Sequence, residues 1–200
     1  LLCTGVPHYG ATLLRVYGTA DARRRYRSYG LWFGLAVLGG FALSLTTPDI
    51  GRWFVTLYLT WSPWHYTAQN FGLAMMFLHR AGFAVDLALR RLVKLSFVLT
   101  YAVLFAGIHG VRSSGGRDPV YSAQGGYLFA SLDMPDALVQ IVLAIAMLAY
   151  VCVVTLMFLR LRSQGRVARL APVIGLVASQ LAWFVVPVLV GRRYPGLWGA

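Results

Sequence analysis

Long apolar stretches, separated by short polar and arginine-rich segments, dominate the sequence. A helix needs about 20 mostly apolar residues to cross a bilayer, because the hydrocarbon layer is about 30 Å thick and a helix rises about 1.5 Å per residue. The opening residues 1–14 are shorter than this and predict a partial span. The pattern therefore predicts an all-α polytopic transmembrane helix bundle with five full spans, over residues 29–46, 50–78, 92–108, 137–159 and 170–190.

Polar residues mark where these helices begin and end. The run Thr47-Pro48-Asp49 ends one helix and offers Asp49 as a cap for the next. Asp133 to Asp136 has the same role before the fourth span. Between the second and third spans, residues 83–94 predict a short amphipathic helix at the membrane surface. In that helix Asp86 pairs with Arg90, one turn further along.

The composition supports a membrane solvent. Hydrophobic residues make up 58% of the 200 residues and charged residues 12%, whereas about a quarter of a soluble domain is charged. The net charge of +12 would suit nucleic acid, but a nucleic-acid-binding domain needs a polar shell that this chain cannot supply. We therefore expect the lipid bilayer as its partner, with other membrane subunits as further candidates, and exclude nucleic acid.

The basic residues predict how the chain is threaded. Most of the 18 lysines and arginines lie in or beside residues 15–28, 79–91 and 160–169, which are alternate connections. Basic residues gather on the cytoplasmic side of membrane proteins, so these three connections are predicted to be cytoplasmic in a multi-pass protein of the inner (plasma) membrane. Residues 1–200 are expected to form a single membrane domain. Because the chain starts without an initiator methionine, we expect it to be part of a longer one.

Polar side chains at the depth of the bilayer centre are the main functional signal. His65 lies near the middle of the second span, about 20 Å from either end, and Gln69 follows one turn later. Gln180 lies at the midpoint of the fifth span, and His8 lies in the opening segment. Polar groups are expensive in hydrocarbon. Their overlapping depths therefore predict a polar intramembrane pocket, whose wall includes Trp64 and Tyr66 as well as Gln69 and Gln180.

Three interpretations of this pocket remain open. Neutral imidazoles bind zinc, copper and iron, so His8 and His65 are candidate ligands of a transition metal. The same groups would also suit a cavity that relays protons or holds a substrate. A third interpretation is structural, because His and Gln side chains form hydrogen bonds between membrane helices. Whether the protein is an enzyme is left open by these residues.

Several familiar chemistries lack their sequence motifs. The chain contains no H-E-x-x-H, no C-x-x-C, no Walker loop and no G-x-S-x-G elbow. A di-iron carboxylate site needs acidic residues within the bundle, and the six aspartates all lie outside mid-depth.

Two short runs carry a resemblance to known proteins. Residues 7–15 read P-H-x-x-x-T-x-x-R and residues 64–72 read W-H-x-x-x-Q-x-F-G. Together they resemble a group of bacterial polytopic membrane proteins of unassigned function. More distantly, the chain resembles the membrane carotene-cleaving dioxygenases of bacteria, in which histidines on several spans hold an iron. That resemblance implies His8 and His65 as metal ligands.

These observations give two functional expectations. The first is a membrane protein with a polar pocket around His65, Gln69 and His8, acting as a His-metal enzyme on a lipid-soluble substrate. The second is a non-catalytic membrane component, either a small-solute carrier or a structural subunit of a membrane complex.

Overall fold

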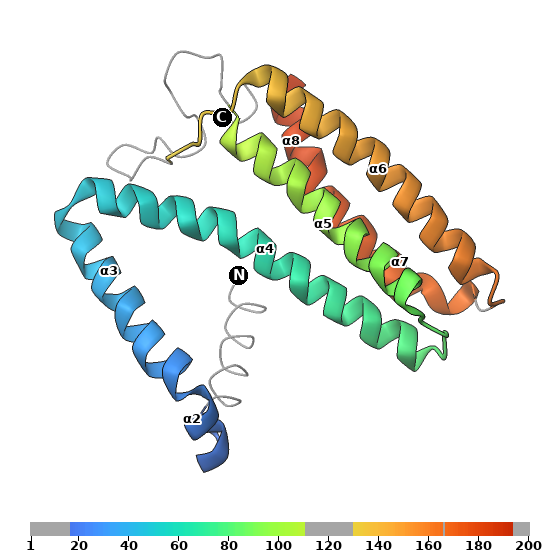
Figure 1. The fold of residues 1–200 in the computed structure, drawn as a ribbon, viewed down its shortest axis with the longest axis horizontal. Coiled ribbons are helices and arrows are strands. Elements are labelled where there is room, and N and C mark those ends of the chain that lie inside the picture. Colours follow the sequence, from blue (N-terminus) through green and yellow to red (C-terminus); the bar gives the residue numbers. More distant parts are fainter. Residues whose placement is uncertain (1–16, 111–129, 166, 194–200) are drawn as a thin grey trace. The chain divides into compact units, whose positions relative to one another are not determined.

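The computed structural model describes residues 17–110, 130–165 and 167–193, and helices are the regular elements of these ranges (Figure 1). The all-α prediction is therefore confirmed. The elements in chain order are α2 (Ala20–Arg27), η1 (Ser28–Phe33), α3 (Gly34–Thr46), α4 (Pro48–Arg80), α5 (Leu87–His109), α6 (Asp136–Arg162), η2 (Val167–Leu170), α7 (Ala171–Gln180), η3 (Leu181–Val185) and α8 (Val186–Arg193).

In the described part of the chain, three helical stretches are long and apolar enough to cross a membrane: Leu87–His109, Asp136–Arg162 and Val167–Arg193. A fourth would be added if Ala20–Arg27 and Gly30–Thr46, which are bent by 63°, formed one span. The helical nature of the chain is as expected, but the number of such stretches is smaller than the five predicted.

The difference falls on the first two predicted spans, and each has a physical reason. Residues 29–46 are divided between the π-helical turn η1 and the 13-residue helix α3. Helix α4 has 33 residues and is about 50 Å long at the standard rise, so its length is sufficient. Its middle, however, contains the polar run of residues 61–70, which lowers the hydropathy of every window across it.

Contacts between residues divide the chain into two units, Leu1–Phe54 and Val55–Ala200. In the first unit, Thr19 caps α2 by accepting a hydrogen bond from the Ala22 amide at 3.1 Å. Gly40 on α3 packs under the ring of Phe54, since a Cβ atom at Gly40 would lie 2.3 Å from Phe54 Cζ. A glycine is therefore needed where α3 meets the first turns of α4.

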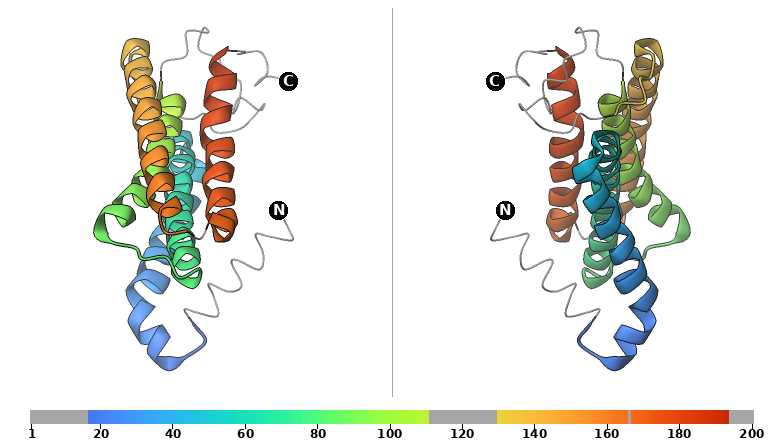
Figure 2. Two further views of the ribbon diagram at one scale, coloured as in Figure 1. Left: turned by 90° about the vertical axis from the view of Figure 1, so that its right-hand side faces the viewer. Right: turned by 90° about the vertical axis from the view of Figure 1, so that its left-hand side faces the viewer.

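The second unit is a bundle around α5. Helix α6 packs along one side of α5, while α7, η3 and α8 pack along another (Figures 1 and 2). One core cluster lies near the ends of α4 and α6, and a second lies toward the start of α6. The first contains Ala74, Leu78, Phe83, Leu89, Val93, Phe97, Tyr150, Met157, Leu161, Leu170, Val173 and Val177, and the second Val103, Ala106, Val139, Leu143, Ala146, Val185 and Val188.

The connection between α4 and α5 corrects one prediction. No separate surface helix forms over residues 83–94, because residues 83–86 have no regular secondary structure and α5 itself starts at Leu87. Asp86 caps that start, accepting from the Leu89 amide at 2.7 Å. Its carboxylate also pairs with Arg160 Nη1 at 3.2 Å, on the neighbouring helix α6, where the sequence predicted a pair with Arg90.

Acidic residues lie in the first turns of α4 and α6 but do not cap them as predicted, because α4 begins at Pro48 and the N-cap of α6 is Pro135, which has no side-chain cap bond. Asp49 and Asp136 both lie in the first turn of their helix, where a negative charge interacts favourably with the helix dipole. Asp136 also accepts a hydrogen bond from Gln140 Nε2 at 2.6 Å and forms an ion pair with Arg192 of α8. The start of α6 is thereby linked to the end of the chain's last described helix.

Proline has different effects in two of the helices. Pro63 lies inside α4, which is continuous around it. Pro187 follows a π-helical segment, in which the Val186 amide donates to the Leu181 carbonyl. A proline has no N–H to donate to the carbonyl four residues earlier, here that of Trp183. The wider π-turn before Pro187 fits this loss, because the hydrogen-bond ladder is already displaced there.

Candidate functional site

A buried polar cluster lies where α4, α5 and α7 meet. Gln180, only 2% exposed, donates from Nε2 to the Thr100 hydroxyl at 2.8 Å and to the Phe97 carbonyl at 2.9 Å. Its Oε1 accepts from Asn70 Nδ2 at 2.9 Å, and the Thr67 hydroxyl lies 3.3 Å from Nε2. We call these four polar side chains, of Thr67, Asn70, Thr100 and Gln180, the Gln180 cluster.

The hydroxyl groups of the cluster are also bonded within their own helices. Thr67 donates to the Pro63 carbonyl at 2.8 Å and Thr100 donates to the Phe97 carbonyl at 2.8 Å. Each hydroxyl proton is thus used, which leaves the oxygen free to accept from Gln180. Among the described residues, every fully buried side-chain nitrogen or oxygen has a partner. The cluster is therefore a satisfied interhelical contact.

The structure places the predicted pocket residues on different faces of α4. Thr67 is 2% exposed and faces the core, whereas His65 is exposed and Gln69 is half-buried. Residues two apart on a helix point about 200° apart, so His65 and Thr67 face nearly opposite directions. Gln180 bonds Asn70 of α4, which follows the predicted Gln69 in the sequence. His8, the other predicted ligand, lies outside the described residues.

Aromatic residues flank His65 in the sequence of α4. The ring of Tyr66 is 6.1 Å from the His65 ring, and Tyr66 is 53% exposed. Trp64 packs edge-on against Tyr101 of α5 with 5.2 Å between ring centroids. Trp61 is also exposed. Two of the predicted wall residues, Trp64 and Tyr66, therefore lie beside His65 with substantial parts of their rings accessible.

The buried position of His109 could not be predicted from the sequence. It ends α5 and is only 2% exposed. The Leu132 amide donates to its Nδ1 at 3.3 Å, and its Nε2 is 3.0 Å from the Thr60 hydroxyl. An amide can only donate, so Nδ1 carries a lone pair and the ring proton is assigned to Nε2. The neutral imidazole thus joins α4 to the segment before α6.

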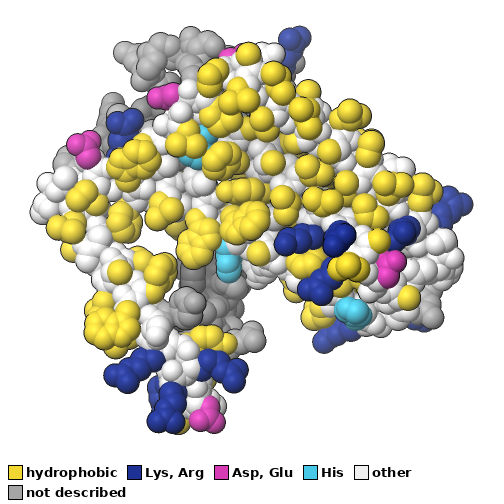
Figure 3. Space-filling view, viewed as in Figure 1, with side chains coloured by type: hydrophobic (Ala, Val, Ile, Leu, Met, Phe, Trp, Pro, Cys, Tyr) yellow, Lys and Arg dark blue, Asp and Glu magenta, His cyan; other side chains and the backbone are white. Residues whose placement is uncertain are grey.

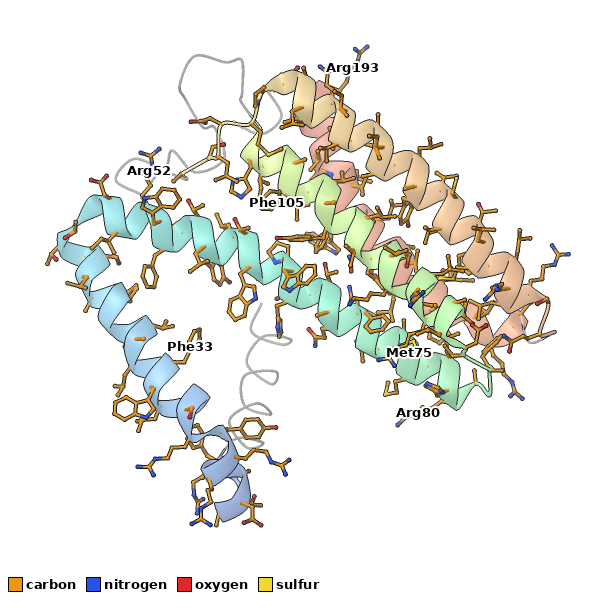
Figure 4. All side chains as sticks on the ribbon, in the orientation of Figure 1. Phe33, Arg52, Met75, Arg80, Phe105 and Arg193 are labelled. Atoms are coloured by element: carbon orange, nitrogen blue, oxygen red, sulfur yellow. The ribbon has the colours of Figure 1, made fainter. Side chains whose placement is uncertain are left out.

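This segment is held by further bonds around the same helix end. The backbone carbonyl of His109 accepts from the Met134 amide at 2.9 Å and from the Ser131 hydroxyl at 3.1 Å. Thr56 of α4 accepts from the Ala130 amide at 2.7 Å. The Phe105 ring, labelled in Figure 4, is tilted by 45° against the imidazole, with 4.5 Å between the ring centroids. A histidine at a helix end gives no sequence signal for such packing.

Within residues 17–110, 130–165 and 167–193, no group of three or more His, Cys, Asp or Glu side chains is arranged to hold a metal ion. Any metal bound at His65 would need ligands from elsewhere. A comparison of the chain with family models, with curated proteins and with solved structures finds no match in any of the three.

Proposed function

We propose that the chain is a multi-pass protein of the inner (plasma) membrane with an intramembrane site on the His65 face of α4. In this proposal residues 29–46 and 50–78 also cross the bilayer, which gives five spans. The connections at residues 15–28, 79–91 and 160–169 are then cytoplasmic. The bonds between the loops before α5 and after α6 support this threading, because Gln164 bonds both the amide and the carbonyl of Ala84, at 2.9 and 3.0 Å.

The observation that carries the site is the contrast between the two faces of α4. On the core face, Thr67 and Asn70 are bonded to Gln180 and have a structural role. On the other face lies His65, exposed at the same depth, with Gln69 one turn away. A polar side chain at membrane depth faces lipid only at considerable expense. His65 lies outside the buried core, so we propose that its role is to contact a ligand or substrate that covers it.

The chemistry that best fits this face is recognition of a lipid-soluble molecule. Trp61, Trp64 and Tyr66 offer apolar ring surface beside the imidazole, as ligand pockets with few polar groups do. His65 together with His8 would hold a transition metal through neutral ring nitrogens, and such a metal would act as a Lewis acid or redox centre. Gln69 would orient the bound molecule by hydrogen bonding.

Metal analysis of the purified full chain tests this proposal. We expect stoichiometric iron, zinc or copper in the wild type, and its loss in both His65→Ala and His8→Ala. His79→Ala is the matched control, because His79 lies on the same helix but in its last turn. Absence of metal from the wild type after supplementation during expression, or equal metal in all variants, would refute the metal site.

A second function is favoured by the Gln180 cluster itself. Its polar groups are mutually satisfied, which is typical of helix association rather than of ligand binding. A non-catalytic component, either a small-solute carrier or a structural subunit, would have such a core and no metal. In that case His65→Ala would alter the association of the chain with other membrane subunits, seen as a change in complex size on native gels.

The threading has a separate test. Reporter tags inserted after Gly82 and after Gly165 should lie on the same side of the membrane, because the two loops are hydrogen-bonded to each other. A tag before Asp133 should lie on the opposite side, because the 27 residues of α6 intervene. Tags of all three kinds on one side would contradict the proposed spans.

A further inference from the structure

One end of the second unit carries a dense group of cations. Among its described residues these are Arg80, Arg90, Arg91, Lys94, Arg160, Arg162 and Arg169, all exposed, and the acidic residue among them is Asp86. Figure 3 shows Lys and Arg side chains gathered where α4 ends and α5 begins. Arg80 lies at this end, and Arg193 lies at the far end of the bundle (Figure 4).

Direct contacts of Arg160, Gln164 and Arg169 join the two loops at this end of the bundle. Arg160 reaches across to Asp86 at 3.2 Å, and Arg169 donates to the Ala81 carbonyl at 3.2 Å. The Gln164 side chain forms its two bonds with Ala84 between them. The loop before α5 and the turn after α6 are therefore joined. Cations from α4, α5, α6 and η2 form one surface as a result.

The first turns of α5 show what kind of surface this is. Lys94 follows Arg91 by three residues and Arg90 by four, so the three side chains lie on one face of the helix. The same exposed face carries Leu87 and Leu95, which are 63% and 43% exposed. Large apolar side chains beside cations suit a layer that is partly lipid and partly charged. They do not suit a face surrounded by water alone.

The length of α5 places this face at the lipid headgroups. Its 23 residues span about 35 Å, against about 30 Å for the hydrocarbon layer. If α5 crosses the bilayer, it extends beyond the hydrocarbon, and we expect the excess at the end that carries its three cations, because charged side chains are costly in hydrocarbon. Lys94 is seven residues from Leu87, or about 10 Å along the axis, and its flexible stem can reach back to the phosphates.

We propose that this face, formed by Arg90, Arg91 and Lys94 of α5, binds the headgroup of an anionic phospholipid. The phosphate would accept hydrogen bonds from the two guanidinium groups and the ammonium group, while Leu87 and Leu95 contact the adjoining glycerol and acyl chain. Basic clusters next to a membrane-crossing helix on the cytoplasmic side attract anionic lipids in this way. The inference rests on the membrane embedding of the proposed function and is independent of the His65 site.

Lipid competition in detergent tests it on the full chain. The purified protein is mixed with phosphatidylglycerol and phosphatidylcholine in equal molar amounts, and the bound lipids are counted by native mass spectrometry. We expect phosphatidylglycerol to be enriched in the wild type. Each removed cation should lower the enrichment about fivefold, which is the contribution of one basic residue to binding at an anionic membrane surface. Arg91→Gln with Lys94→Gln removes two charges from the face.

The matched control also removes two charges, but from the opposite end of the bundle, by Arg192→Gln with Arg193→Gln. This variant should retain the enrichment. A charge-keeping variant, Arg90→Lys with Arg91→Lys, should retain most of it. Equal losses in the two charge-removing variants would overturn the proposal, since they would show an effect of net charge alone.

Two further outcomes also decide against a lipid site. Inorganic phosphate that displaces the bound phosphatidylglycerol at equal concentration would identify a phosphate-ion site instead. Co-purification of an acidic protein that competes with the lipid would identify a protein interface. Metal content measured on the same samples separates this proposal from the His65 site, because loss of lipid preference leaves the metal unchanged.

Discussion

Replacing Gln180 with leucine should loosen the contact between α7 and the helices α4 and α5. Leucine has a similar volume and no polar atoms, so the change removes the hydrogen bonds with little change in packing. The side chain lies against α4 and α5 at once, through Asn70 on the first and Thr100 on the second. The free energy of unfolding is therefore expected to fall.

The hydrogen bonds of Gln180 set the size of the effect. Its two N–H groups face three acceptors, so they form two full bonds, and Oε1 forms a third with Asn70. Bonds between membrane helices are worth about 0.6 kcal/mol each, which gives about 2 kcal/mol for Gln180→Leu. The hydroxyls of Thr67 and Thr100 still bond to their own helices, so no larger penalty is expected from them.

Reversible unfolding in mixed micelles, in which a denaturing detergent is titrated against a mild one, measures this loss. Asn70→Leu should also lower stability, and the double variant should lose less than the two single changes together, because both polar partners are then gone. Gln69→Leu is the matched control on the adjacent residue, outside the cluster. A Gln180→Leu protein as stable as the wild type, or strict additivity with Asn70→Leu, would refute the assigned hydrogen bonds.

Two other substitutions test the packing at the opposite end of α5. His109→Phe should lower the free energy of unfolding by about 1–2 kcal/mol, because it removes the bonds to Thr60 and Leu132 while keeping an aromatic ring. The same detergent titration measures this loss, and an unchanged unfolding midpoint would contradict the buried position of His109. Gly107→Ala should cost about 1–3 kcal/mol, because its Cβ would lie 2.6 Å from two methyl carbons of Val188. Adding Val188→Ala should restore part of the stability that Gly107→Ala loses. Gly72→Ala should leave stability unchanged, because nothing lies within 4 Å of the new Cβ atom. A larger loss of stability in Gly72→Ala than in Gly107→Ala would contradict the packing.

Helix positions were predictable because length and apolarity determine them. The predicted range 137–159 lies within Asp136–Arg162, and 92–108 lies within Leu87–His109. Depth along a helix was also predictable, since the rise per residue is fixed. Gln180 was singled out by this reasoning, and the structure places it in the buried polar cluster.

The direction in which a side chain points was not predictable in the same way. In a soluble helix the apolar face identifies the core, but in a helix that crosses the bilayer, as we propose for α4, both the lipid face and the core face are expected to be apolar. The polar run of residues 61–70 on α4 therefore does not reveal which of its members face inward. In the structure Thr67 and Asn70 face inward, and His65 is exposed. Similarly, Asp86 pairs with Arg160, a residue 74 positions away that no local spacing can indicate.

The bonding of the two threonines bears on how the bundle is assembled during synthesis. Because Thr67 and Thr100 donate their protons to carbonyls of their own helices, these two hydroxyl groups form hydrogen bonds before α4 and α5 pack against other helices. The hydrogen bonds of the Gln180 side chain, by contrast, reach other helices, α4 and α5. Gln180 lies on the helix that leaves the ribosome after both of the others. The groups that Gln180 bonds, Asn70 on α4 and Phe97 and Thr100 on α5, are therefore synthesised before Gln180 itself.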